Sequence, residues 1–159
     1  MTIAVDFDGT IVEHRYPAIG KEIPFAIETL KKLAADGHKL ILWTAREGQL
    51  LEDAIEFCKV RGLEFFSINA DLPDANWEGY KTTRKLRVDC FIDDRNLGGL
   101  PDWSTIYMMI SRNLTFGDML RDGYEEPEKK GLFSRLRERT RSSRDRLTHR
   151  SHHHTRHHW

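Results

Sequence analysis

The sequence predicts an α/β fold, a three-layer sandwich in which helices cover both faces of a central parallel sheet. Short apolar runs, typical of buried strands, alternate along the chain with longer segments whose apolar side chains recur at helical spacing. Strands that alternate with helices in this way form parallel sheets with both faces covered. The runs expected to be strands are Ile3–Phe7, Lys39–Thr44, Leu63–Ile68 and Val88–Ile92.

The segments between these runs carry signals for helix starts and ends. The first helix is expected to open around Pro24, which suits a first helical turn, and to end at Gly37. The later helices are expected over Gln49–Arg61, Glu78–Arg87, Trp103–Ile110 and Thr115–Leu120. Residues 9–23 and 69–77 contain glycine, proline or aspartate at short intervals and are expected to be loops.

Charge is divided unevenly along the 159 residues. Residues 1–127 carry 15 basic and 22 acidic side chains, whereas residues 128–159 carry 10 basic and 3 acidic ones. We therefore expect one domain over residues 1–122 and a basic, His-rich tail over residues 123–159 that is disordered or partly helical. Such a tail suits weak contact with an anionic partner, either RNA or a membrane surface.

The cysteines and the hydropathy pattern predict a cytoplasmic protein. Cys58 and Cys90 lie in apolar stretches without the spacing of metal ligands, so we expect both to be reduced, buried packing residues. No run approaches the roughly 18 apolar residues of a transmembrane segment. The first expected strand begins at the N-terminus, which leaves no room for a signal peptide.

The most informative stretch is Asp6-Phe7-Asp8-Gly9-Thr10, at the end of the first apolar run. Two carboxylates two residues apart along a strand point to the same side. Two like charges at the head of a buried strand are costly unless a cation or hydrogen-bond donors compensate them. The pattern therefore indicates a bound metal ion.

Further polar residues follow the other expected strands. Thr44 ends the second strand, and Asp93 and Asp94 follow the fourth. Ligands of parallel α/β sheets bind at the carboxyl ends of the strands, so these side chains are expected to gather there. Carboxylates and a phosphate oxygen suit Mg²⁺. The chemistry that fits is phosphoryl transfer through an aspartyl-phosphate, with a lysine to neutralise the phosphoryl oxygens.

These motifs, in this order, resemble those of the haloacid dehalogenase superfamily over about residues 1–122. The matching segments are Asp6-Phe7-Asp8-Gly9-Thr10, Thr44 after Leu40-Ile41-Leu42-Trp43, a lysine before the last strand, and Phe91-Ile92-Asp93-Asp94. The resemblance implies a Rossmann-like fold and an Mg²⁺-dependent phosphatase. It also implies a role for each matching residue. Asp6 would be the nucleophile, and Asp8 the acid/base that additionally offers its backbone carbonyl to the metal. Thr44 would supply the hydroxyl and Lys85 the lysine, while Asp94 and Asp93 would be the metal-binding acidic pair.

Two of these assignments stay open from the sequence. The phosphate-binding lysine is Lys85 by register, with Lys81 as the alternative, and Asp94 is expected on the metal with Asp93 close behind it. The intervals between Asp8, Thr44 and Lys85, of 35 and 40 residues, leave no room for an inserted lid domain. The resemblance is thus to small members without a cap domain.

The expected substrate is a small phosphorylated metabolite of the nucleotide or sugar phosphate class. Arg46, Glu47 and Arg95 follow strand ends and are candidates for substrate binding, with a structural ion pair as the alternative for each. The rival function is a non-catalytic, phosphate-binding regulatory or RNA-associated protein that uses the basic tail. Both functions are compatible with a homo-oligomer.

Overall fold

The computed structural model describes residues 1–73 and 85–121. The chain divides into two units, Met1–Leu114 and Thr115–Trp159. The first holds a sheet and three helices, and α4 (Phe116–Arg121) is the described helix of the second. The predicted tail and all but the last three residues of the predicted helix Glu78–Arg87 lie outside the described residues. None of the described helices is long and apolar enough to cross a membrane.

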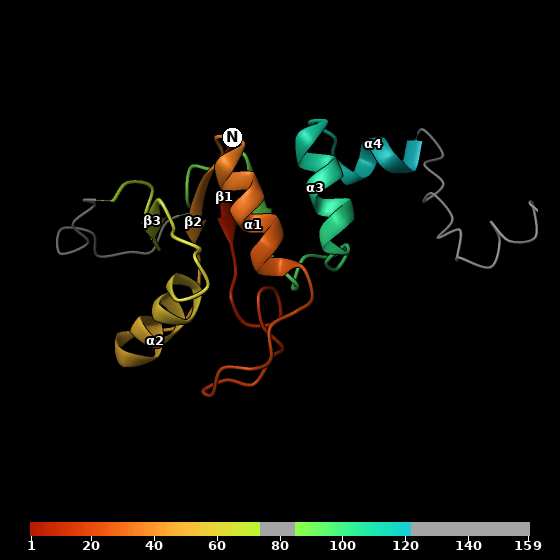
Figure 1. Cartoon of the computed structure of the whole chain (residues 1–159). Coiled ribbons are helices and arrows are strands. Elements are labelled where there is room, and N and C mark those ends of the chain that lie inside the picture. Colours follow the sequence, from red (N-terminus) through yellow and green to blue (C-terminus); the bar gives the residue numbers. More distant parts are fainter. Residues whose placement is uncertain (74–84, 122–159) are drawn as a thin grey trace, which may run out of the picture. The chain divides into compact units, whose positions relative to one another are not determined.

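The sheet has four strands, all parallel, in the order β3-β2-β1-β4 (Figure 1). Val5 at the end of β1 lies opposite Leu42 of β2 and Ile92 of β4, so these three strands end at the same level. This arrangement confirms the predicted α/β class with a parallel sheet. The strands are β1 (Thr2–Val5), β2 (Lys39–Leu42), β3 (Ser67–Ile68) and β4 (Cys90–Ile92).

The strands are shorter than predicted, because the chain turns soon after each one ends. Phe7 leaves the sheet because its carbonyl accepts hydrogen bonds from the N–H groups of Ile11 (2.9 Å) and Val12 (3.2 Å). The sheet still extends by single hydrogen bonds, from Asp6 N to Ile92 O (3.0 Å) and from Trp43 N to Val5 O (2.8 Å). Asp6 and Trp43, the residues directly after β1 and β2, are therefore still held by the sheet.

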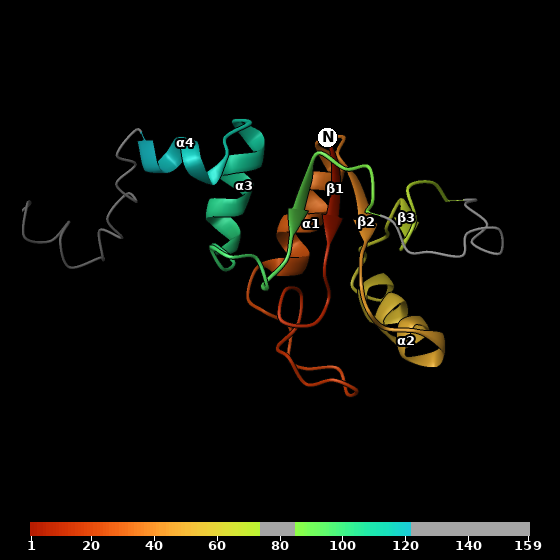
Figure 2. The same cartoon turned by 180° about the vertical axis from the view of Figure 1, so that it is seen from behind.

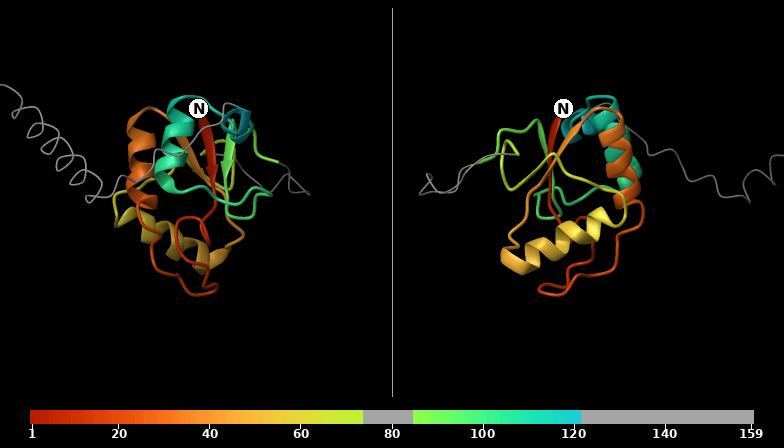
Figure 3. Two further views of the ribbon diagram at one scale, coloured as in Figure 1. Left: turned by 90° about the vertical axis from the view of Figure 1, so that its right-hand side faces the viewer. Right: turned by 60° about the vertical axis from the view of Figure 1, so that its left-hand side comes forward.

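Helices α1 (Ala26–Ala35), α2 (Gly48–Lys59) and α3 (Trp103–Ser111) contribute to one core on one face of the sheet. α1 stands in front of β1 in Figure 1 and behind it in Figure 2. α1 and α3 run side by side (Figure 3). The Tyr107 hydroxyl of α3 donates a hydrogen bond to Asp36 at the end of α1. The buried side chains of this core come from β1, β2 and β4 and from the helices, for example Ile3, Val5, Leu30, Leu33, Leu42, Ala54, Cys58, Ile92 and Ile106.

A smaller cluster lies on the other face of the sheet. Strand residues alternate in direction, so Ala4 and Ile41 point away from the main core, and Leu86 covers them. Residues 85–87, predicted to be helical, are irregular instead. The described helices thus cover one face, and the layer predicted on the second face falls largely on residues outside the description.

The two cysteines differ in burial. Cys58 is buried within the main core and reduced, as predicted. Cys90 is also a free thiol but only half-buried, which corrects the prediction of full burial. Cys90 lies in β4, which is an edge strand of the sheet. Among the described residues, β4 has a neighbouring strand on one side alone, so Cys90 is less covered.

The segment between β1 and α1 folds back over the strand end. Glu13 N donates to Lys21 O (2.7 Å) and Ile23 N to Ile11 O (2.9 Å), which closes residues 13–21 into a loop. Gly20 is required at its base, since a Cβ there would come within 2.0 Å of the Glu13 carbonyl oxygen. α1 begins at Ala26, two residues beyond Pro24, because Ile23 is held by this loop.

Candidate metal centre

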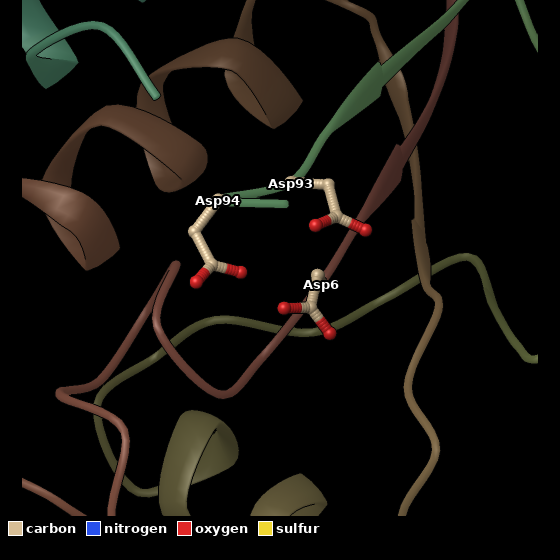
Figure 4. Close-up of side chains that lie close together, drawn as sticks. All are labelled: Asp6, Asp93 and Asp94. Carbon is tan, nitrogen blue, oxygen red and sulfur yellow. The ribbon is translucent and has the colours of Figure 1, made fainter. Parts of the chain in front are cut away.

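Three carboxylates meet where β1 and β4 end. Asp6 follows β1 directly, and Asp93 and Asp94 follow β4, the neighbouring strand. One oxygen from each of the three lies within 4.8 Å of the others. Figure 4 shows the carboxylates facing one another across the strand ends. The sequence prediction that Asp6, Asp93 and Asp94 gather at this edge is thus realised in the structure.

The electrostatics of Asp6 show the cost of this arrangement. Burial raises the pKa of Asp6 to about 7, and the negative charges of Asp93 and Asp94 add to the rise. The Phe7 N–H and the Thr10 hydroxyl, which donates to Asp6 Oδ2 at 3.2 Å, oppose it only in part. Without a cation, Asp6 is therefore only partly ionised at neutral pH.

Asp94 shows a second sign of a missing partner. Its Oδ1 is buried and has no hydrogen-bond partner among residues 1–73 and 85–121. Its carboxylate packs against Gly9, where a Cβ would come within 2.4 Å of Oδ2, and Gly9 has a φ of +91°. A buried carboxylate oxygen without a partner is costly, and an oxygen-binding cation at the three aspartates would satisfy it. The donor set therefore fits a hard divalent ion.

Thr10 joins the two halves of the site. Its hydroxyl donates to Asp6 and accepts from the backbone N–H of Asp94 at 3.1 Å. Thr10 is fully buried, so the connection does not compete with water. One side chain thereby fixes the nucleophile candidate after β1 relative to the acidic pair after β4.

The Asp8 side chain belongs to a different group. Both its oxygens accept hydrogen bonds from Arg46, at 2.7 Å from Nε and 2.7 Å from Nη2. Arg46 is itself buried, with its side chain 1% exposed against 13% for Asp8. Arg46 also donates to the carbonyl oxygens of Pro17 (3.0 Å) and Ala18 (2.9 Å) in the loop over the strand end. This pairing favours the ion-pair alternative for Arg46.

Thr44 follows β2 at the same edge. Its backbone N–H donates to the Asn69 side chain (2.8 Å), and its hydroxyl accepts from the Arg46 N–H (3.2 Å). The hydroxyl proton is left to donate to another group, as the predicted role requires.

The other candidates lie around this edge. Lys85 is exposed, with its Nζ 5.5 Å from the centre of the Phe91 ring, and Lys81 lies outside the described residues. Glu47 is exposed at the start of α2. Arg95 follows Asp94, and its N–H donates to Asp93 Oδ1 at 2.8 Å. The choice between the two lysines stays a prediction.

A solved structure from Bacteroides thetaiotaomicron, described as that of a conserved protein coded by a locus of that organism, is similar to this chain. The two are 62% identical, with a TM-score of 0.69, and the match covers 75% of this chain and 96% of that one. The chain belongs to the family of this Bacteroides protein. Comparisons with protein-family models and with curated proteins found no match.

Asn69 is a site residue that sequence reasoning placed only in a loop. It follows β3, has a φ of +50°, and its side-chain oxygen holds the N–H of Thr44. A polar residue directly after the third strand is the signal that would have found it, by the same rule that found Thr44 and Asp93. In this chain, polar residues thus follow each of the four described strands, directly or after one residue.

Proposed function

We propose that the protein is an Mg²⁺-dependent phosphomonoester hydrolase of the haloacid dehalogenase type that acts on a small phosphorylated metabolite. The observation that carries the proposal is the set of three carboxylates at the carboxyl edge of a parallel sheet, with a buried oxygen on Asp94 that has no partner in the described part of the chain. Asp6, Asp93 and Asp94 would hold the ion. When bound, Mg²⁺ supplies positive charge that offsets the negative charge of the phosphoryl oxygens.

In the proposed reaction, an oxygen of Asp6 attacks phosphorus. The bond from phosphorus to the ester oxygen breaks, and Asp8 protonates the leaving alcohol. Water then attacks the aspartyl-phosphate and gives its proton to Asp8, which releases inorganic phosphate and restores Asp6. Thr44 donates a hydrogen bond to a phosphoryl oxygen, and Lys85 supplies a cation.

The pairing of Asp8 with Arg46 is compatible with this role. A carboxylate has about four lone-pair sites, and the two hydrogen bonds from Arg46 occupy one on each oxygen. Arg46 fixes the orientation of the carboxylate, so Asp8 does not need to be ordered during the reaction. The small exposed part of Asp8 is the side from which a proton would be exchanged.

The test is phosphate release from p-nitrophenyl phosphate by the full chain with Mg²⁺. We expect Asp6→Asn to lower turnover by at least about a thousandfold, since it removes the nucleophile, while the circular dichroism spectrum stays native. Asp53→Asn, an exposed substitution of the same kind on α2, is the control and should retain wild-type turnover. Equal turnover by Asp6→Asn and the wild type would refute the covalent mechanism.

A further inference from the structure

Arg95 is a cation beside three carboxylates, yet its side chain points elsewhere. Its backbone N–H is bound to Asp93, which fixes the residue against the cluster. A guanidinium so placed is expected to fold onto the nearest carboxylate. Instead Nη2 of Arg95 lies 3.1 Å from Nε2 of His14, and within residues 1–73 and 85–121 it forms no ion pair. Most of its five N–H donors are thus open.

His14 belongs to the loop over the strand end, so the contact spans two segments. The loop is well anchored, because Arg46 binds two of its carbonyl oxygens and stacks within 5.4 Å of the Tyr16 ring. Its base is closed by the Glu13–Lys21 hydrogen bond. His14 is therefore held at the edge of the candidate site, beside Arg95, by a preorganised segment. Preorganisation lowers the conformational entropy that is lost when a ligand binds there.

The contact also defines the chemistry of His14. Arg95 has no acceptor, so it donates, and Nε2 of His14 must carry a lone pair. In the neutral ring the proton then lies on Nδ1, which makes Nδ1–H a second donor at the rim. Both side chains are exposed, so the donors of Arg95 and His14 are accessible to a ligand. A fork of N–H donors on a cation matches a carboxylate or a phosphate.

We infer that Arg95 and His14 form a subsite for a second oxyanion of the substrate, so that the preferred substrates are phosphomonoesters carrying a further carboxylate or phosphate. This inference rests on the proposed phosphatase function and deepens it. The three aspartates would hold the ion at the reacting end of the substrate, and Arg95 and His14 would select the group at its other end. A sugar phosphate with no second charged group would leave the guanidinium N–H donors of Arg95 without an anionic partner.

The experiment uses matched pairs of linear alkyl phosphates that end in either a carboxylate or a hydroxyl, with two to six carbons between the groups. The full chain is expected to favour the carboxylate member by about tenfold or more in kcat/KM at one chain length, as a charge-assisted hydrogen bond allows. Arg95→Ala should abolish this preference, so that the carboxylate member is hydrolysed no better than the hydroxyl member. His14→Ala should reduce the preference in part.

Arg15→Ala is the matched control, because Arg15 is an exposed cation next to His14 on the same loop. It should keep the preference. No preference at any length, or an equal loss in Arg15→Ala and Arg95→Ala, would overturn the subsite. Calorimetric binding of the same pairs to Asp6→Asn gives a readout without turnover. If the wild type discriminates in binding but hydrolyses nothing, the proposed reaction fails and the subsite stands.

Discussion

Asp6 combines two properties that pull in opposite directions. It is the candidate nucleophile, which must be ionised to attack, and it is a buried group whose pKa is raised to about 7 by burial and by Asp93 and Asp94. A bound cation resolves the conflict, because it stabilises the ionised form. Metal binding at Asp6 can therefore be detected from the pH dependence of the free energy of unfolding, without an activity assay.

In EDTA, we expect the protein to be less stable at pH 8 than at pH 5. A raised pKa in the folded state means that stability is fully present below the unfolded pKa near 4 and is lost as pH rises through about 7. Asp6 should contribute roughly 1–3 kcal/mol to this loss, after allowance for its partial exposure. Urea unfolding at both pH values measures it.

Two comparisons isolate this contribution of Asp6. Asp6→Asn cannot ionise, so its free energy of unfolding should fall less between pH 5 and pH 8 than that of the wild type. Mg²⁺ should raise the melting temperature more at pH 8 than at pH 5. The idea fails if the wild type and Asp6→Asn lose the same stability over this interval.

At the scale of elements, Arg46 joins segments that are distant in sequence. It lies between β2 and α2, and it binds Asp8 after β1 and two carbonyl groups of the loop before α1. A second arginine, Arg61 at the end of α2, also contacts this region through Glu22, but that ion pair is more than a third exposed. The two arginines allow the contributions of a buried and an exposed ion pair to stability to be compared.

We expect Arg46→Met to lower the free energy of unfolding by about 3–5 kcal/mol, because it leaves the Asp8 carboxylate largely buried without its partner. Arg61→Met should cost about 1 kcal/mol or less, as is usual for exposed pairs. The double variant Arg46→Met/Asp8→Asn should recover part of the loss. Equal costs for the two arginine variants in urea unfolding would contradict a special role for Arg46.

At the scale of the whole molecule, an acidic body is joined to a basic tail. Residues 1–127 have a net charge of −7 and residues 128–159 one of +7. The Bacteroides relative matches over 96% of its length while covering 75% of this chain. The match thus leaves about a quarter of this chain uncovered, whereas the described residues of the candidate site all precede residue 96.

We expect deletion of residues 128–159 to leave kcat/KM for p-nitrophenyl phosphate within about twofold of the full chain, since no candidate catalytic residue is removed. The measurement is steady-state turnover of both forms at the same Mg²⁺ concentration, with melting as a check on folding. Loss of the main activity on deletion would instead favour the regulatory or RNA-associated alternative, in which the tail is the working part.

The sequence by itself determined the α/β class and the polar residues at the strand ends. Apolar runs of strand length are a local signal, and parallel strands end at a common edge, so Asp6, Thr44, Asp93 and Asp94 were expected there. Strand lengths were overestimated, because the turn after Phe7 depends on hydrogen bonds that no local pattern reveals.

Only the tertiary structure decided how the acidic residues are partnered. Asp6 and Asp8 are two residues apart and were both expected beside a cation, yet the Asp6 carboxylate faces Asp93 and Asp94 while the Asp8 carboxylate pairs with Arg46. The physical reason is competition through space. Arg46 reaches Asp8 because β1 and β2 lie side by side, which brings the residues after the two strands together.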